Sequence, residues 1–140
     1  MTVVYNRVAL IGLGLIASSM FWSIRRRNLA QEVVGFAKSE KTRDTAKSIG
    51  LCDHVFNNLK DTVNDADLVV LCTPVGVMGE VVEQIAPYLK KGATLSDVGS
   101  VKRAVLDAVE PLIPQDVYFV PAHPLAGTEH SGPESGFSSL

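Results

Sequence analysis

Two glycines near the start of the chain are spaced so that a backbone turn can approach an anion closely. Gly12, Gly14 and Ala17 match the pattern G-x-G-x-x-(G/A), after a short apolar run and before a helical one. Gly12 permits a tight turn, Gly14 leaves room for a pyrophosphate, and Ala17 allows a helix to pack closely on a sheet. The helix would begin at Leu15 and Ile16 and point its first amides at the anion. Because strand, turn and helix follow in this order, the segment predicts dinucleotide binding rather than a plain tight turn.

The end of the second expected strand bears on which dinucleotide binds. Ala37 stands where domains that prefer NAD place Asp or Glu against the ribose 2′-hydroxyl. Lys38, Ser39, Lys41 and Arg43 follow, and they could donate hydrogen bonds to a 2′-phosphate. The alternative is a polar helix start with solvated cations. We therefore expect NADP or NAD as the cofactor, with the balance toward NADP.

Further polar residues follow the later strands. Thr73 and Pro74 come after the fourth expected strand, and we assign them to the cofactor site. Ser100 follows the fifth strand, where its hydroxyl can orient a substrate or cap the next helix, and Asp97 can support this turn. His123 follows the sixth strand, at the edge where open α/β sheets bind ligands. A neutral imidazole there can take a proton from a substrate hydroxyl as hydride leaves, although a structural loop histidine fits the position equally well.

The elements that would position these residues alternate between apolar strands and amphipathic helices. Strands are expected at Arg7–Ile11, Val33–Ala37, His54–Asn57 (a short edge strand), Leu68–Cys72, Thr94–Val98 and Tyr118–Val120. Helices are expected at Leu15–Arg27, from a Ser39 cap through Ser48, at Leu59–Asn64, along the helical spacing from Val77 to Leu89, and at Val101–Leu112 with Ser100 as cap. This alternation predicts an α/β fold of the Rossmann type, a doubly wound and mostly parallel sheet with helices on both faces.

Composition sets the class of protein. The 140 residues suffice for one domain, and 46% apolar and 20% charged residues are ordinary for a soluble globular protein. A net charge of −2 gives no reason to expect nucleic acid or an anionic membrane as a partner. No stretch approaches the about 18 apolar residues of a membrane span, and Arg7 interrupts the first apolar run, unlike a secretory signal. We expect a cytoplasmic protein with a small-molecule substrate.

The cysteines and the clustered aspartates indicate no further chemistry. Cys52 and Cys72 do not form a disulfide framework, and Cys72 is expected to be a buried free thiol, in keeping with a reducing compartment. Asp61, Asp65 and Asp67 surround a short helix without His or Cys at metal-ligand spacing. We assign no metal.

Three segments of the chain resemble, in order, three signatures of the prephenate/arogenate (cyclohexadienyl) dehydrogenase family. They are Gly12–Ser19, Asp97–Lys102 and His123–Gly132, and together they extend the resemblance over essentially all 140 residues. The third signature is much more specific than the first. Two positions depart from the family pattern: Ala17, where Gly is commoner, and Ala37, where many members carry Asp. The second departure leaves the preference for NAD open.

The resemblance implies NAD(P)-dependent oxidative decarboxylation of prephenate to 4-hydroxyphenylpyruvate, or of arogenate to tyrosine, within tyrosine biosynthesis. The catalytic histidine of the family falls on His123, and its substrate-orienting serine falls on Ser100. The other pocket residues that the resemblance implies are Gly127, Thr128, Glu129 and Ser131.

The family also implies more protein than this chain contains. Its members continue into a further part of the nucleotide domain and a helical dimerisation domain, so residues 1–140 correspond to an incomplete nucleotide domain with a catalytic loop at 121–140. We expect a homodimer at full length and an inactive isolated piece. Two alternatives stay open: another NAD(P)-dependent oxidoreductase of the hydroxyacid or imine type, and a non-catalytic dinucleotide-sensing module.

Overall fold

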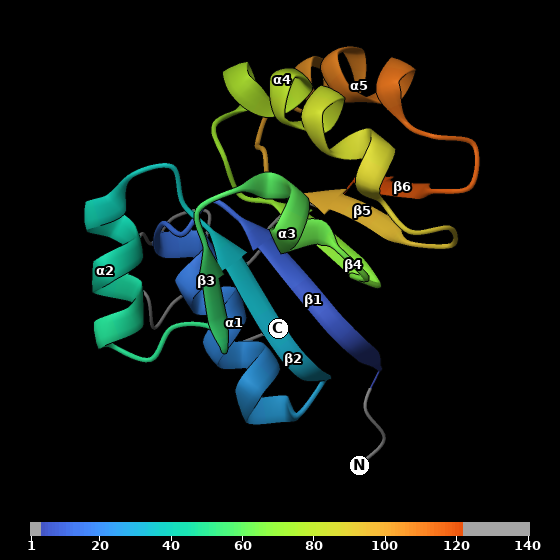
Figure 1. Ribbon diagram of the computed structural model, residues 1–140. Helices are drawn as coiled ribbons and strands as arrows, with labels where there is room; N and C mark the ends of the chain where they lie inside the picture. The colour runs from blue at the N-terminus through green and yellow to red at the C-terminus, as the bar shows by residue number, and fades with distance from the viewer. Residues whose placement is uncertain (1–3, 122–140) are drawn as a thin grey trace.

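A sheet of six strands forms the centre of the computed structural model, which describes residues 4–121 (Figure 1). The strand order is β3-β2-β1-β4-β5-β6, and every neighbouring pair is parallel. The strands are β1 (Tyr5–Ile11), β2 (Ala30–Phe36), β3 (His54–Phe56), β4 (Leu68–Leu71), β5 (Thr94–Asp97) and β6 (Tyr118–Pro121). The expected Rossmann-type α/β fold is confirmed.

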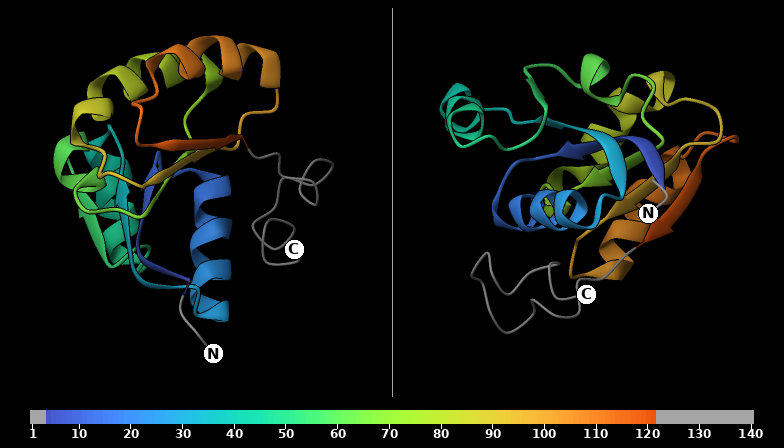
Figure 2. Two further views of the ribbon diagram at one scale, coloured as in Figure 1. Left: turned by 90° about the vertical axis from the view of Figure 1, so that its right-hand side faces the viewer. Right: turned by 90° about the horizontal axis from the view of Figure 1, so that it is seen from below.

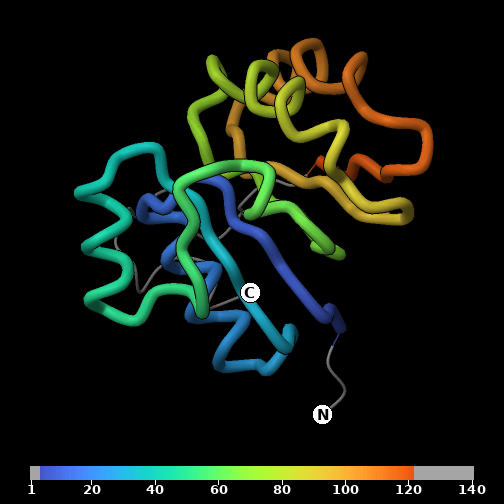
Figure 3. The backbone as a smooth tube through the Cα atoms, in the orientation of Figure 1, coloured from blue at the N-terminus to red at the C-terminus, as the bar shows by residue number. Residues whose placement is uncertain are grey.

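The chain starts in the middle of the sheet and builds it outward in two directions. From β1 it proceeds to the β3 edge, returns to β4 beside β1, and then continues to β6 (Figure 3). The helices are α1 (Leu15–Arg27), α2 (Glu40–Ser48), α3 (Leu59–Val63), α4 (Val75–Ile85) and α5 (Lys102–Val109), with 3-10 turns η1 (Ala86–Tyr88) and η2 (Glu110–Leu112). The order of the strands reverses between β1 and β4, and the carboxyl ends of these two strands are where such sheets bind ligands.

Alternate residues of the central strands pack into two separate cores. Val8 and Leu10 of β1 belong to the core under α1 and α2, whereas Ala9 and Ile11 belong to the core under α3, α4 and α5. All four are fully buried. Figure 2 shows α1 and the α4–α5 pair on different sides of the strands. Burying each large apolar side chain contributes about 1.5–3 kcal/mol, so a parallel strand covered on both faces needs an unbroken apolar run.

Prolines end two helices earlier than the sequence pattern predicts. The helical spacing through Leu89 becomes α4 to Ile85 followed by η1, and the expected helix to Leu112 becomes α5 followed by η2. Pro87 and Pro111 are the second residues of these 3-10 turns. Proline has no amide hydrogen to continue the α-helical bonding, so the helix changes at this point.

Other boundaries agree with the sequence pattern or differ by a few residues. The bounds of α1 are those predicted, and the predicted cap of α2 is confirmed because Ser39 Oγ accepts a hydrogen bond from the Thr42 amide at 3.1 Å. Strand β2 runs from Ala30 to Phe36, three residues earlier at its start than predicted and one at its end. His54 lies exposed in the edge strand β3, as expected.

The two cysteines are free thiols, each partly buried. Burial raises the pKa of Cys52 and of Cys72 to about 12, so both stay protonated at neutral pH. Within residues 4–121, no helix is long and apolar enough to cross a membrane.

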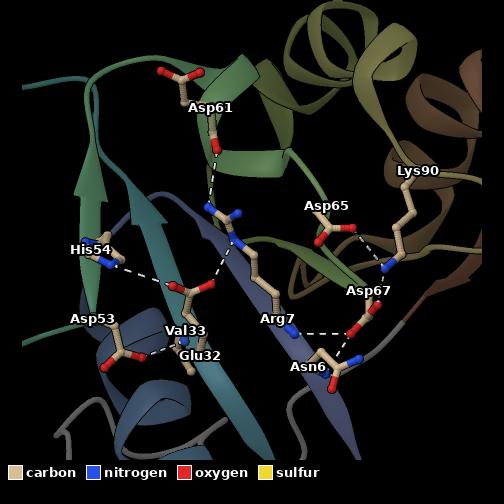
Figure 4. Close-up of polar contacts among 10 residues, drawn as sticks. All are labelled: Asn6, Arg7, Glu32, Val33, Asp53, His54, Asp61, Asp65, Asp67 and Lys90. Carbon is tan, nitrogen blue, oxygen red and sulfur yellow. Dashed lines mark hydrogen bonds and ion pairs between the residues drawn. The ribbon is translucent and has the colours of Figure 1, made fainter.

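Charged side chains hold the amino ends of the strands together (Figure 4). Asp67 Oδ2 accepts hydrogen bonds from the amides of Asn6 at 2.6 Å and Arg7 at 3.1 Å, while its Oδ1 pairs with Lys90 Nζ at 2.5 Å. Burial alone would raise the pKa of Asp67, but the hydrogen bonds from Lys90, Arg7 and Asn6 outweigh it and hold the pKa below its usual value. Asp67 therefore joins the start of β1 to the segment before β5.

We expect Asp67→Ala to lower the free energy of unfolding by about 1–2 kcal/mol at pH 7, because two amides and an ammonium lose their acceptor. The depressed pKa means that this stabilisation is complete above the unfolded carboxyl pKa of about 3.9 and is lost as pH falls through the folded pKa. Urea unfolding of both proteins at pH 7 and pH 3 measures the difference. Asp65→Ala is the matched control, since the Asp65 carboxylate is 75% exposed and contacts Lys90 at 3.4 Å. An equal difference at both pH values would contradict the prediction.

Candidate functional site

The turn between β1 and α1 requires glycine at its first position. Gly12 has φ +97°, and its amide donates a hydrogen bond to Phe36 O at 2.8 Å. A Cβ atom on Gly12 would lie 3.1 Å from Thr73 Cγ2 and 3.2 Å from the Cys72 carbonyl oxygen. Both the backbone conformation and the close neighbours therefore make a larger residue unfavourable here.

The second glycine of the turn faces open space. Gly14 is the N-cap residue of α1, and a Cβ added there would meet no atom within 4 Å. No side chain caps α1, and its first turn holds no acidic residue. The amides of this turn and the positive end of the helix dipole can therefore serve an anion. Leu15 and Ile16 are exposed beside the opening, while Ala17 is fully buried against the sheet.

Arg43, one of the predicted phosphate donors, stabilises the segment after β2 by hydrogen bonds to its backbone. Arg43 Nη1 donates to the carbonyl oxygens of Ala37 at 2.8 Å and Lys38 at 2.9 Å. Ser39 Oγ already accepts the cap hydrogen bond of α2, but its hydroxyl hydrogen can still donate. Lys38 and Lys41 are exposed. Arg43 and Ser39 thus stabilise the conformation of this loop. All five predicted residues lie after the carboxyl end of β2: Ala37, Lys38, Ser39, Lys41 and Arg43.

An unpaired hydroxyl lies beside the glycine turn. Thr73 follows β4, and its Oγ1 is buried without a hydrogen-bond partner among the residues described. Its methyl group faces the position that a Gly12 side chain would fill. Pro74 is the N-cap residue of α4, which also starts at this edge. The open space at Gly14, the uncapped α1 and this hydroxyl fit a bound dinucleotide, since buried polar atoms are nearly always hydrogen-bonded.

A buried carboxylate bonds to two residues of the segment after β5 and stabilises its turn. Asp97 Oδ2 accepts a hydrogen bond from the Gly99 amide at 2.8 Å and an ion pair from Lys102 Nζ at 2.6 Å. The expected support of the turn by Asp97 is confirmed. The prediction that Ser100 caps the next helix is wrong: α5 begins at Lys102, Val101 is its N-cap residue, and no side chain caps it. Asp97 closes the turn in its place, and Ser100 lies exposed.

The structure brings the predicted cofactor residues and Ser100 to one edge of the sheet. They follow the carboxyl ends of β1, β2, β4 and β5, which are neighbours in the strand order. His123, Gly127, Thr128, Glu129 and Ser131 lie outside the described residues. Sequence reasoning gave no role to Lys102, although its spacing from Asp97 is part of the second signature.

The strand order, the glycine turn at the switch point and the uncapped start of α1 define the class of protein: a Rossmann-type nucleotide-binding domain. The family model described as prephenate dehydrogenase, nucleotide-binding domain, matches residues 22–140, and the chain belongs to this family. The resemblance inferred from the three signatures is thereby confirmed.

Relatives and solved structures agree with this family. The cyclohexadienyl dehydrogenase of Zymomonas mobilis is 43% identical over 137 residues, which are 98% of this chain and 46% of that protein. The prephenate dehydrogenase of Lactococcus lactis is 32% identical over 91% of this chain and 36% of its own. The crystal structure of A. aeolicus prephenate dehydrogenase in complex with hydroxyphenyl propionate and NAD+ is 28% identical, with a TM-score of 0.80 over 95% of this chain and 46% of that one. The chain thus spans less than half the length of these proteins.

Substitution by alanine should affect stability at Gly12 and cofactor affinity at Gly14. We expect Gly12→Ala to destabilise the fold by about 1–2 kcal/mol or more, because a left-handed residue gains a Cβ against Thr73 and Cys72. Gly14→Ala should unfold like the wild type, since its Cβ meets nothing, yet bind NAD+ and NADP+ about tenfold or more weakly, because the Cβ occupies the approach to the pyrophosphate. Thermal unfolding and calorimetric titration separate the two effects. Unchanged cofactor affinity in Gly14→Ala would exclude this turn as the binding site.

Proposed function

We propose that the natural full-length protein catalyses the NAD(P)-dependent oxidative decarboxylation of prephenate or arogenate. Membership of the prephenate dehydrogenase family carries this proposal. The relative from A. aeolicus, whose solved complex holds NAD+ and hydroxyphenyl propionate, supports it, because this chain superposes on that structure with a TM-score of 0.80. The products would be 4-hydroxyphenylpyruvate or tyrosine, together with carbon dioxide.

The residues at the sheet edge would divide the work of binding the cofactor. Gly12 and Gly14 would let the backbone approach the pyrophosphate, whose charge the first-turn amides of α1 would meet. Thr73 and Pro74 would line the site between the two helix starts. When bound, the nicotinamide ring would accept the hydride that leaves ring C4 of the substrate.

The remaining chemistry requires orientation and one proton acceptor. In this proposal Ser100 orients the C4 hydroxyl, and His123 takes its proton as the hydride departs. Loss of the ring carboxylate as carbon dioxide then makes the ring aromatic, which drives the reaction. Gly127, Thr128 and Ser131 would shape the pocket, with Glu129 at its mouth.

We further propose that NADP binds at least as well as NAD. Ala37 offers no carboxylate to hold a ribose 2′-hydroxyl or to repel a 2′-phosphate, and the exposed Lys38 and Lys41 lie close by in the chain. We also propose that the full-length protein is a cytoplasmic homodimer whose remaining half includes a helical domain. The two free, protonated thiols fit a reducing compartment.

The experiment that tests the proposed reaction is reduced-cofactor absorbance with the natural full-length protein. Prephenate and arogenate are each supplied with NAD+ and with NADP+. Appearance of reduced cofactor with either substrate establishes the reaction, and the four rates define both preferences. Cofactor binding without oxidation of either substrate would favour another oxidoreductase activity or a dinucleotide-sensing role.

The proposed proton acceptor predicts a specific kinetic defect. We expect His123→Asn to bind cofactor with unchanged affinity but to turn over about 10²–10⁴-fold more slowly, the usual contribution of a positioned general base. His54→Asn is the matched control, because His54 is exposed in the edge strand β3. Turnover of His123→Asn within twofold of the wild type would remove this residue from the mechanism.

The preference between cofactors should move with the residue after β2. We expect Ala37→Asp to weaken NADP+ relative to NAD+ by about tenfold or more, because a carboxylate near a phosphate costs about 1–4 kcal/mol at near-contact distance. Ala37→Asn is the control, since it adds similar volume without charge. Binding constants for both cofactors decide the matter, and an unchanged ratio in Ala37→Asp would contradict the proposed 2′-phosphate site.

A further inference from the structure

One carboxylate oxygen of Asp97 contacts two residues of the segment that connects β5 to α5. Asp97 is fully buried at the end of β5, and its Oδ2 receives both the Gly99 amide at 2.8 Å and Lys102 Nζ at 2.6 Å. The first contact fixes the backbone before Ser100, and the second fixes the first residue of α5. Ser100 therefore lies between two residues, Gly99 and Lys102, that both bond to Asp97 Oδ2.

The neighbours of this turn leave it little room to shift. A Cβ on Gly99 would lie 2.8 Å from Val105 Cγ2 of α5, 2.9 Å from Val75 Cγ2 of α4, and 3.2 Å from Asp97 Oδ2. The backbone at Gly99 thus packs directly against two helices and the carboxylate. Since interiors are close-packed, such a segment changes position only if its neighbours move.

The side chain of Ser100 caps no helix in the part of the chain that the structure describes. Ser100 is exposed, and α5 has Val101 as its N-cap residue without a side-chain cap. A serine just before a helix usually caps it, and here the Asp97 carboxylate has taken over the closing of the turn. The local structure therefore fixes the backbone of Ser100 while leaving its side chain available.

The second oxygen of the Asp97 carboxylate is left without a partner at the carboxyl edge of the sheet. Asp97 Oδ1 is buried and has no hydrogen-bond partner within the described part of the chain. A carboxylate that only held the fold would normally have both oxygens satisfied, because an unmet buried acceptor is costly. It lies at the same sheet edge as the unpaired Thr73 Oγ1, one strand away.

We propose that Asp97 is a positioning residue that acts through Gly99 and Lys102 to hold Ser100 toward the substrate hydroxyl. This inference rests on the proposed function. The carboxylate takes no part in the bond changes. Its effect is to confine Ser100 to one backbone position, so that the hydroxyl does not have to be ordered during each turnover.

A double-mutant cycle in the natural full-length protein tests the proposal. The wild type, Asp97→Asn, Ser100→Ala and the double variant are compared for kcat, KM and cofactor affinity. We expect Asp97→Asn to lower kcat about 10- to 100-fold, the cost of a small misplacement, with cofactor affinity within about twofold of wild type. Because Asp97 acts through Ser100, its substitution should cost less than about twofold in kcat when Ser100 is already alanine.

Two further variants keep the test decisive if Asp97→Asn folds poorly. Lys102→Met leaves the buried carboxylate in place and should show the same dependence on Ser100, whereas Lys102→Arg keeps the pair and should retain most of the activity. Asp107→Asn is the matched control, because it removes an exposed carboxylate that pairs with Arg103 at 3.8 Å on the same helix.

The outcomes separate this inference from the proposed function. Equal losses from Asp97→Asn, or from Lys102→Met, in the presence and absence of the Ser100 hydroxyl would show a purely structural role and overturn the positioning role. A wild type that oxidises neither prephenate nor arogenate would overturn the proposed function and this inference with it. An active wild type with additive losses would overturn the inference alone.

Discussion

The backbone of the β1–α1 turn lies so close to the end of β4 that even a Cβ atom on Gly12 would be crowded, and the arrangement of the candidate site depends on this contact. Gly12 donates its amide to Phe36 O in β2, while the Cys72 amide donates to Ile11 O in β1, each at 2.8 Å. One turn is thus bonded to both neighbouring strands. The start of α1, the residues after β2 and the residues after β4 are placed relative to one another by these two bonds, and they form the proposed cofactor site.

The two ends of the sheet satisfy their polar groups differently. At the amino ends, Asp67 and Asp53 accept backbone amides and pair with cations. Arg7 Nε is buried there without a hydrogen bond among residues 4–121, but it lies 3.4 Å from Glu32 Oε1 and forms an ion pair with it. At the carboxyl ends, Thr73 Oγ1 and Asp97 Oδ1 are buried without a partner among residues 4–121. Unlike Arg7 Nε, neither of these two atoms lies opposite a charged partner of its own, and both lie at the edge where open α/β sheets bind ligands.

Periodicity and turn chemistry were sufficient to predict the fold. Apolar runs such as Leu68–Leu71 are typical of strands covered on both faces, and the glycine turn indicated where α1 begins. The sequence could not show which of several polar side chains would form the hydrogen bonds of a given turn. Ser100 has the residue type of a helix cap, but the capping position was lost because Asp97, three residues earlier, bonds Gly99 and Lys102. Arg43 likewise reads as a phosphate donor, although one of its nitrogens already bonds two carbonyl oxygens.

Charge is distributed unevenly along the candidate site, between the part proposed to bind the cofactor and the part proposed to orient the substrate. After β2, the ammonium groups of Lys38 and Lys41 are exposed and make no ion pair within the described residues, so they can attract a phosphate from solvent. After β5, the ammonium of Lys102 is neutralised by the buried Asp97 carboxylate at 2.6 Å. A free cation at that second position would bind any anion regardless of its orientation. A neutral pair adds rigidity without long-range attraction, which suits the end of the site where Ser100 is proposed to present its hydroxyl to the substrate.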